Sequence, residues 1–140
     1  MTTYDRATYS GSCLCAAVQF RIEAELPRIQ VCYCRQCRKA QGTPFATNIP
    51  VPTTAFVLVS GAATLREYES SPGKKRVFCS CCGSPIYSYR AGLDVLRIRA
   101  GLINEPLPGP LIHCRVAWKC NWWHILDAGP QFQEGCDELV

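Results

Sequence analysis

The amino-acid sequence predicts a mainly β fold of antiparallel strands with little helix. Three observations support this prediction: short segments are rich in β-branched and aromatic residues, apolar and polar side chains alternate within them, and turn-forming residues separate them. With 140 residues, the chain is expected to form a single domain over residues 1–140. Its hydrophobic content of 48% and charged content of 19% are those of a globular protein, so disorder is not expected.

Seven segments carry the strand pattern. In residues 18–22, Val18, Phe20 and Ile22 alternate with polar side chains, as in a strand with one buried face. The six others, in chain order, are residues 29–33, 56–59, 64–68, 76–79, 86–89 and 95–99. Turn-forming residues lie between several of these segments, at residues 60–61, 71–73, 83–85 and 91–92. Short strands joined by such turns are typical of antiparallel sheets.

Helix and loop are expected in few places. Residues 35–41 are compatible with one or two helical turns, and Gly42 is expected to end them. Residues 104–110 contain three prolines and a glycine, which predicts an irregular loop. The segment that begins near Leu111 is too short to form a domain of its own.

Seven of the eleven cysteines lie in tight clusters, which divide into a set of four and a set of three. The set of four is Cys13, Cys15, Cys79 and Cys82, and the set of three is Cys32, Cys34 and Cys37. The first eleven residues lack the apolar segment of a secretion signal, and no stretch approaches eighteen apolar residues, so a cytoplasmic protein without membrane contact is expected. In a reducing cytosol, clustered cysteines are typical of metal ligands or catalytic groups rather than disulfides.

The set of four predicts a structural zinc site. Cys79-x-x-Cys82-Gly83 has the spacing of a zinc knuckle, and Cys13-x-Cys15 supplies two more sulfurs from a distant strand. Four thiolates saturate a tetrahedral zinc ion, which would join the two segments. That these two pairs meet is an inference, because spacing alone does not determine it. The alternative is that the four cysteines are buried as small apolar side chains.

The set of three predicts a catalytic zinc site. Cys32-x-Cys34-x-x-Cys37 can bring three sulfurs to one ion at the end of a strand, and three ligands leave one position for water or a substrate thiol. The alternative is a second closed site. Its fourth ligand would then be one of His113, His124, Cys114 and Cys120.

The remaining cysteines and the charged residues are less specific. Cys81 is expected to point away from the metal, and most of Cys114, Cys120 and Cys136 are expected to be structural. Basic residues near both clusters would attract a small anionic substrate. They are Arg35, Arg38 and Lys39 in one segment and Lys74, Lys75 and Arg76 in the other. Seven zinc-bound thiolates would reduce the formal charge of +4 to about +1, so nucleic acid is not an expected partner.

The ordered motifs resemble the glutathione-dependent formaldehyde-activating enzyme family (zinc-binding, centromere protein V-like). They are Gly11-Ser-Cys-x-Cys15, Cys32-x-Cys-x-x-Cys-Arg-Lys39, Ser71-Pro-Gly-Lys74, Arg76-Val-Phe-Cys-x-x-Cys-Gly-Ser-Pro85 and Trp123-x-Ile-x-Asp-x-x-Pro-Gln-Phe132. The similarity covers about residues 11–132. It implies a β-tent-like zinc fold with the two metal sites assigned above. One residue departs from the family pattern: Tyr33 stands where the family commonly has histidine, and strand alternation predicts that it faces away from the metal.

The resemblance implies a carbon–sulfur lyase similar to S-(hydroxymethyl)glutathione synthase, which condenses glutathione with formaldehyde. Two zinc ions per chain are then expected, one structural and one catalytic, with a small thiol such as glutathione as substrate. Arg35, Arg38 and Lys39 are candidates for binding its carboxylates. The alternative is a zinc-stabilised module without catalysis, either a glutathione carrier or a protein-interaction domain. Edge strands in a small β fold are also compatible with a homodimer.

Overall fold

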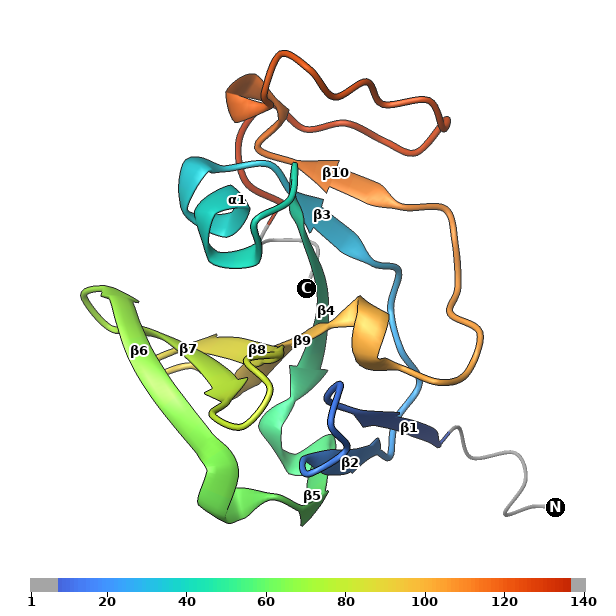
Figure 1. Ribbon diagram of the computed structural model, residues 1–140. Coiled ribbons are helices and arrows are strands. Elements are labelled where there is room, and N and C mark those ends of the chain that lie inside the picture. Colours follow the sequence, from blue (N-terminus) through green and yellow to red (C-terminus); the bar gives the residue numbers. More distant parts are fainter. Residues whose placement is uncertain (1–7, 137–140) are drawn as a thin grey trace, which may run out of the picture.

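Residues 8–136 are described by the computed structural model, which consists of two β-sheets and one short α-helix among these residues (Figure 1). The strands are β1 (Tyr9–Ser12), β2 (Gln19–Ile22), β3 (Gln30–Cys32), β4 (Ala46–Pro52), β5 (Phe56–Ser60), β6 (Leu65–Ser71), β7 (Lys74–Cys79), β8 (Pro85–Arg90), β9 (Val95–Arg99) and β10 (Ile112–Cys114). The helix α1 spans Arg35–Gln41. Short 3₁₀ turns occupy Thr53–Ala55, Ala62–Thr64, Ala100–Leu102 and Val116–Trp118. The predicted mainly β fold is therefore confirmed.

The larger sheet has seven strands in the order β10-β3-β4-β9-β8-β7-β6, and the smaller sheet has the order β1-β2-β5. Neighbouring strands are antiparallel except β10 and β3, which are parallel. Figure 1 shows that the larger sheet is strongly bent, with β10 and β3 at one end, β6, β7 and β8 at the other, and α1 beside β3. Side chains from the two ends of this sheet can thus line the same cavity.

The hydrophobic core lies between the two sheets. Ile49 of β4 and its partner Ile98 of β9 are fully buried, and Phe20 and Ile22 of β2 join the same cluster. Because successive side chains of a strand point to opposite faces, the neighbour Arg97 projects from the other face of β9. The larger sheet therefore has one face in the core and one face available for a site.

Helix α1 begins and ends as its sequence predicts. The sulfur of Cys34, the N-cap residue, accepts a hydrogen bond from the backbone N–H of Cys37, and Gly42 ends the helix with a φ of 69°. This left-handed conformation is one that glycine adopts readily. Arg99 donates a hydrogen bond from Nε to Oε1 of Gln41 at 3.0 Å, which ties the end of the helix to β9.

All seven predicted strand segments are strands in the structure, but β1, β4 and β10 were not predicted. Strand β4 lies inside the sheet although it contains Pro50 and Pro52, which weaken any strand pattern in the sequence. It pairs with β3 only through residues 46–48, so both prolines lie beyond that ladder and interrupt none of its hydrogen bonds. Within residues 8–136, no helix has the length and apolarity needed to cross a membrane.

The close approach of β1 to β2 gives a first prediction. A Cβ atom on Gly11 would lie 2.4 Å from Cζ of Phe20 and 2.7 Å from the carbonyl oxygen of Leu102, so Gly11→Ala must displace core or backbone atoms. We expect it to lower the free energy of unfolding by about 1–3 kcal/mol in urea titrations at fixed zinc concentration. Gly101→Ala is the control, because no atom lies within 4 Å of its Cβ position. Equal stability of the two variants would contradict this account of β1 packing.

Candidate functional site

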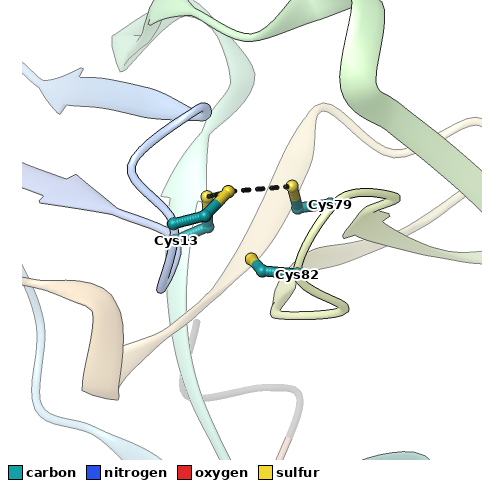
Figure 2. Close-up of side chains that lie close together, drawn as sticks. Cys13, Cys79 and Cys82 are labelled. Atoms are coloured by element: carbon teal, nitrogen blue, oxygen red, sulfur yellow. Dashed lines mark hydrogen bonds between the residues drawn. The ribbon is translucent and has the colours of Figure 1, made fainter.

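The first candidate site is the four-cysteine cluster, whose sulfur atoms lie within 4.8 Å of one another. Cys13 and Cys15 come from the loop between β1 and β2, and Cys79 and Cys82 come from the end of β7 and the turn that follows (Figure 2). The sulfur of Cys15 lies 3.7 Å from that of Cys13 and 3.9 Å from that of Cys79. The structure thus brings together the two pairs that the sequence analysis combined. Four sulfurs in this arrangement could hold one metal ion.

Hydrogen bonds from both loops hold the sulfurs of this cluster in place. The backbone N–H of Val18 donates to the sulfur of Cys13 at 3.3 Å. Ser84 accepts a hydrogen bond from the N–H of Leu14 at 3.0 Å, and its hydroxyl lies 3.3 Å from the sulfur of Cys82. This contact with Ser84 is the chief reason why the pKa of the Cys82 thiol is lowered to about 5. At Cys82 the site therefore favours the thiolate form, which is the form that binds metals, whereas the pKa of Cys15 is raised to about 12.

The second candidate site is the three-cysteine cluster, whose sulfurs also lie within 4.8 Å of one another. Cys32 ends β3, Cys34 caps α1 and Cys37 lies in its first turn. Hydrogen bonds from the thiols of Cys32 and Cys37 lower the pKa of the Cys34 thiol to about 2, whereas the same contacts raise the pKa of Cys32. Cys34 therefore ionises more readily than Cys32. Together they could hold a metal ion with three protein ligands.

This cluster lies at the wall of a cavity of about 660 Å³, which is within the usual size range of small-molecule sites. The cavity occupies the face of the bent sheet opposite the core, and its walls come from both ends of that sheet. Six basic residues line it, and no acidic residue of the described chain does. They are Arg35, Lys74, Arg76, Arg90, Arg97 and Arg115. The cavity thus combines a sulfur cluster with a positively charged wall.

Two of these basic residues show why the wall favours an anion. The pKa of Lys74 is lowered, first because burial disfavours its charge. On Arg76, Nε donates to the hydroxyl of Ser70 at 3.0 Å, while Nη1 is buried and has no hydrogen-bond partner among the described residues. A buried donor without an acceptor is unfavourable. A negatively charged ligand would supply an acceptor to Arg76 and compensate the charge of Lys74.

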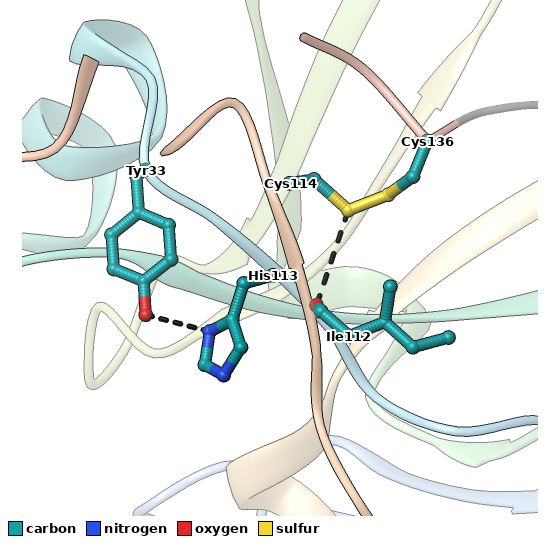
Figure 3. Close-up of a disulfide and its surroundings, with 5 residues drawn as sticks. All are labelled: Tyr33, Ile112, His113, Cys114 and Cys136. Carbon is teal, nitrogen blue, oxygen red and sulfur yellow. Dashed lines mark hydrogen bonds between the residues drawn. A yellow bond between two sulfur atoms is a disulfide. The ribbon is translucent and has the colours of Figure 1, made fainter. Parts of the chain in front are cut away.

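A hydrogen-bond chain lies on the other face of β3 and β10, buried at Tyr33 and His113 and exposed at Asp127. The hydroxyl of Tyr33 is 2.8 Å from Nδ1 of His113 (Figure 3). Nε2 of His113 is 3.0 Å from a carboxylate oxygen of Asp127. Tyr33 thus points away from the three-cysteine cluster, as strand alternation predicted. Because both ring nitrogens of His113 have partners, the structure does not support His113 as a fourth ligand. Asp127 in turn accepts a hydrogen bond from the N–H of Gly129 at 2.8 Å, which fixes the C-terminal loop.

The expectation that the cysteines form no disulfide is wrong for one pair. Cys114 and Cys136 form a disulfide, and both line the cavity (Figure 3). The sequence offers no ligand spacing for either residue, and their separation of 22 positions gives no pairing signal. Cys120 and the exposed Cys81 remain free, and neither belongs to a sulfur cluster in the described chain. With Cys114 bonded to Cys136, the structure supports neither Cys114 nor Cys120 as a fourth ligand.

The predicted basic residues reach the cavity only in part. Arg35 lines it, whereas Arg38 and Lys39 do not. Lys74 and Arg76 line it as well, so the two basic segments of the sequence contribute to one surface. Residues of β8 and β9 that complete the wall were not predicted, because only strand register places them there. His124 belongs to neither sulfur cluster.

Comparisons with known proteins agree on one family. The model of the glutathione-dependent formaldehyde-activating enzyme family matches residues 8–117. A Halomonas elongata protein named as a putative glutathione-dependent formaldehyde-activating enzyme is 32% identical over 126 residues, which are 82% of this chain and 79% of that protein. A Schizosaccharomyces pombe protein named as an uncharacterized lyase is 33% identical over 97 residues, 69% of each chain. The crystal structure of a Rhodobacter sphaeroides protein has the same fold, with a TM-score of 0.58 at 21% identity, covering 74% of this chain and 98% of that one.

The four-cysteine cluster gives a second prediction. Cys79→Ser removes one of four converging sulfurs, so we expect the purified protein to lose one metal ion per chain and to unfold at a markedly lower temperature. Metal content is measured by mass spectrometry and unfolding by calorimetry. Cys81→Ser, two residues away and exposed, is the matched control and should change neither quantity. A Cys79→Ser protein with unchanged metal content and an unchanged unfolding temperature would contradict a structural metal ion at this cluster.

Proposed function

Because the chain belongs to the glutathione-dependent formaldehyde-activating enzyme family, we propose that it is a zinc-dependent carbon–sulfur lyase that joins a small thiol, glutathione, to formaldehyde. The observation that carries this proposal is the three-sulfur cluster at the wall of a positively charged cavity. Among the described residues, the four cysteines of the other cluster do not line this cavity, and we assign that cluster a structural role.

Both clusters suit zinc. Cysteine sulfur is a soft ligand that zinc prefers, and sulfurs within 4.8 Å of one another can share one tetrahedral ion. Cys13, Cys15, Cys79 and Cys82 would supply all four ligands of one ion, while Cys32, Cys34 and Cys37 would supply three ligands of the other. At the three-sulfur site, zinc would act as a Lewis acid that lowers the pKa of a substrate thiol and polarises an aldehyde.

The cavity suits glutathione in size and charge. Glutathione carries two carboxylates and one amino group, and the described residues give the cavity wall six basic side chains and no acidic one. Lys74 and Arg76 are placed on the same face of β7, because they are two residues apart. Their charges would hold a carboxylate at one wall while the thiol reaches the opposite wall at Cys32. These contacts would orient the thiol for reaction and raise its local concentration.

The reaction itself needs only two reactants. The sulfur of the thiol attacks the carbonyl carbon of formaldehyde, which forms one carbon–sulfur bond. The electron pair of the carbon–oxygen π bond moves to oxygen, which takes up one proton, and the thiol loses one proton. The product is the hydroxymethyl thioether. The contributions of the chain are to hold the thiol, to exclude part of the solvent and to stabilise negative charge with its basic wall.

The catalytic proposal predicts that Cys34→Ser abolishes the protein-dependent part of adduct formation. The variant loses a sulfur that two neighbouring thiols and the N–H of Cys37 hold in place. Formation of S-(hydroxymethyl)glutathione is followed by nuclear magnetic resonance with labelled formaldehyde, and the uncatalysed rate is subtracted. Cys81→Ser should keep the wild-type rate, because it lies outside both clusters.

Equal rates for wild type and Cys34→Ser would overturn the catalytic proposal without affecting the fold. If calorimetry then shows that the wild-type protein binds glutathione without turnover, the non-catalytic carrier is the better description. If Cys34→Ser then fails to bind glutathione, the binding site of the carrier lies at the same cavity.

The charged wall gives a further prediction. Lys74→Gln should raise KM for glutathione about tenfold with little change in kcat, because it removes a contact that is present both before and during the reaction. Lys75→Gln is the matched control, since Lys75 lies on the other face of β7, 3.5 Å from a carboxylate oxygen of Glu67. The uncharged thiol 2-mercaptoethanol should react equally with both variants. If Lys74→Gln lowered kcat/KM equally for glutathione and for 2-mercaptoethanol, that result would contradict a contact between Lys74 and a carboxylate.

A further inference from the structure

The Cys114–Cys136 disulfide lies next to the three-cysteine cluster. In the parallel pair of β10 and β3, Cys114 is the register partner of Cys32, and the N–H of Tyr33 donates to the carbonyl of Cys114 at 3.2 Å. Paired residues of adjacent strands are about 5 Å apart and project from the same face of the sheet. Both cysteines also line the same cavity. Backbone pairing in the sheet, rather than a flexible loop, thus holds Cys114 beside Cys32.

Backbone hydrogen bonds hold the segment that carries Cys136 independently of the disulfide. The carbonyl of Pro130 accepts from the N–H of His113 at 2.8 Å, and the N–H of Phe132 donates to the carbonyl of His113 at 2.8 Å. The carbonyl of Glu134 accepts from the N–H of Arg115 at 2.7 Å. Reduction of the disulfide would therefore leave the segment docked through residue 134. Its main effect would be a new thiol at Cys114 in the cavity wall.

We propose that reduction of the Cys114–Cys136 disulfide converts the three-cysteine cluster into a four-cysteine metal site, with Cys114 as the fourth ligand. In the oxidised state, Cys114 is bonded to Cys136 and the fourth position is open to a substrate thiol. In the reduced state, rotation of the Cys114 side chain brings its sulfur to that position. This inference rests on the proposed function, because it requires metal binding by Cys32, Cys34 and Cys37.

The redox step requires a small-molecule thiol as reductant, a class that the cavity is proposed to bind. Its thiolate attacks the sulfur of Cys136, a new sulfur–sulfur bond forms, and the electron pair of the broken bond leaves on Cys114 as a thiolate. A second thiol then attacks the mixed disulfide, which releases the oxidised reductant and the thiol of Cys136. Two thiols thus supply the two electrons that reduce the disulfide. Cys114 leaves in the form that a metal ion binds.

The test is the number of sulfur ligands at each metal site, measured by ¹¹³Cd nuclear magnetic resonance on protein loaded with Cd²⁺. The chemical shift of this nucleus depends on how many thiolates bind it, and the cluster of Cys13, Cys15, Cys79 and Cys82 provides a four-sulfur reference in the same spectrum. For the oxidised wild-type protein we expect one four-sulfur and one three-sulfur signal. Reduction with a phosphine should move the second signal into the four-sulfur range.

Two variants separate the role of Cys114 from other effects of reduction. Cys136→Ser leaves the thiol of Cys114 free and should give two four-sulfur signals without reductant. The double variant Cys114→Ser/Cys136→Ser should keep the three-sulfur signal with and without phosphine. Competition with a chelator should show Cd²⁺ binding at the second site at least about tenfold tighter in Cys136→Ser than in the double variant.

Each outcome of this experiment is decisive. A second signal that stays in the three-sulfur range after reduction of the wild-type disulfide, verified by mass spectrometry, overturns the inference and leaves the proposed function intact. A signal that moves equally in the double variant overturns it as well, because another ligand must then be responsible. Absence of any second signal in both redox states removes the metal site, and with it the proposed function.

Discussion

Strand β7 links the four-cysteine cluster to the wall of the cavity, so the position of that wall depends on the cluster. Its last residue, Cys79, is a member of the four-sulfur cluster, while Lys74 and Arg76 near its start line the cavity of the three-sulfur cluster. A strand is stiff and its side chains alternate, so fixing Cys79 also fixes which face and position these two basic side chains take. A metal ion that joins Cys79 to the loop after β1 would therefore determine the shape of the cavity as well as the stability of the fold.

Electrostatic repulsion among the sulfurs explains why basic residues surround the cavity. Three thiols within 4.8 Å of one another cannot all ionise without compensating charge, and hydrogen bonding within the cluster lowers the pKa of Cys34 while it raises that of Cys32. A divalent cation would allow all three to ionise and would leave a net charge of about −1. Six basic side chains outweigh this charge, so the cavity as a whole still attracts an anion.

The sequence predicted those parts of the structure that depend on local patterns. Alternation located β2 and β9, and Gly42 located the end of α1. Cysteine spacing located the three-cysteine cluster and each of the two pairs of the four-cysteine cluster. Local patterns carry no signal for parts that long-range pairing determines. Strand β4 contains two prolines, but both lie beyond the residues that pair with β3. Arg97 lines the cavity because the register of β9 turns its side chain away from the core.

Cys32 and Cys114 show why the role of a cysteine cannot be assigned from its own neighbourhood in the sequence. The two residues are register partners on one face of the sheet, yet Cys32 joins a sulfur cluster and Cys114 a disulfide. Cys32 meets Cys34 and Cys37 through one strand end and one helical turn, so little chain entropy is lost. Cys114 meets Cys136 only after the C-terminal segment has docked along β10 through backbone hydrogen bonds. The three-cysteine cluster is thus a local property of the chain, whereas the partner of Cys114 depends on tertiary structure.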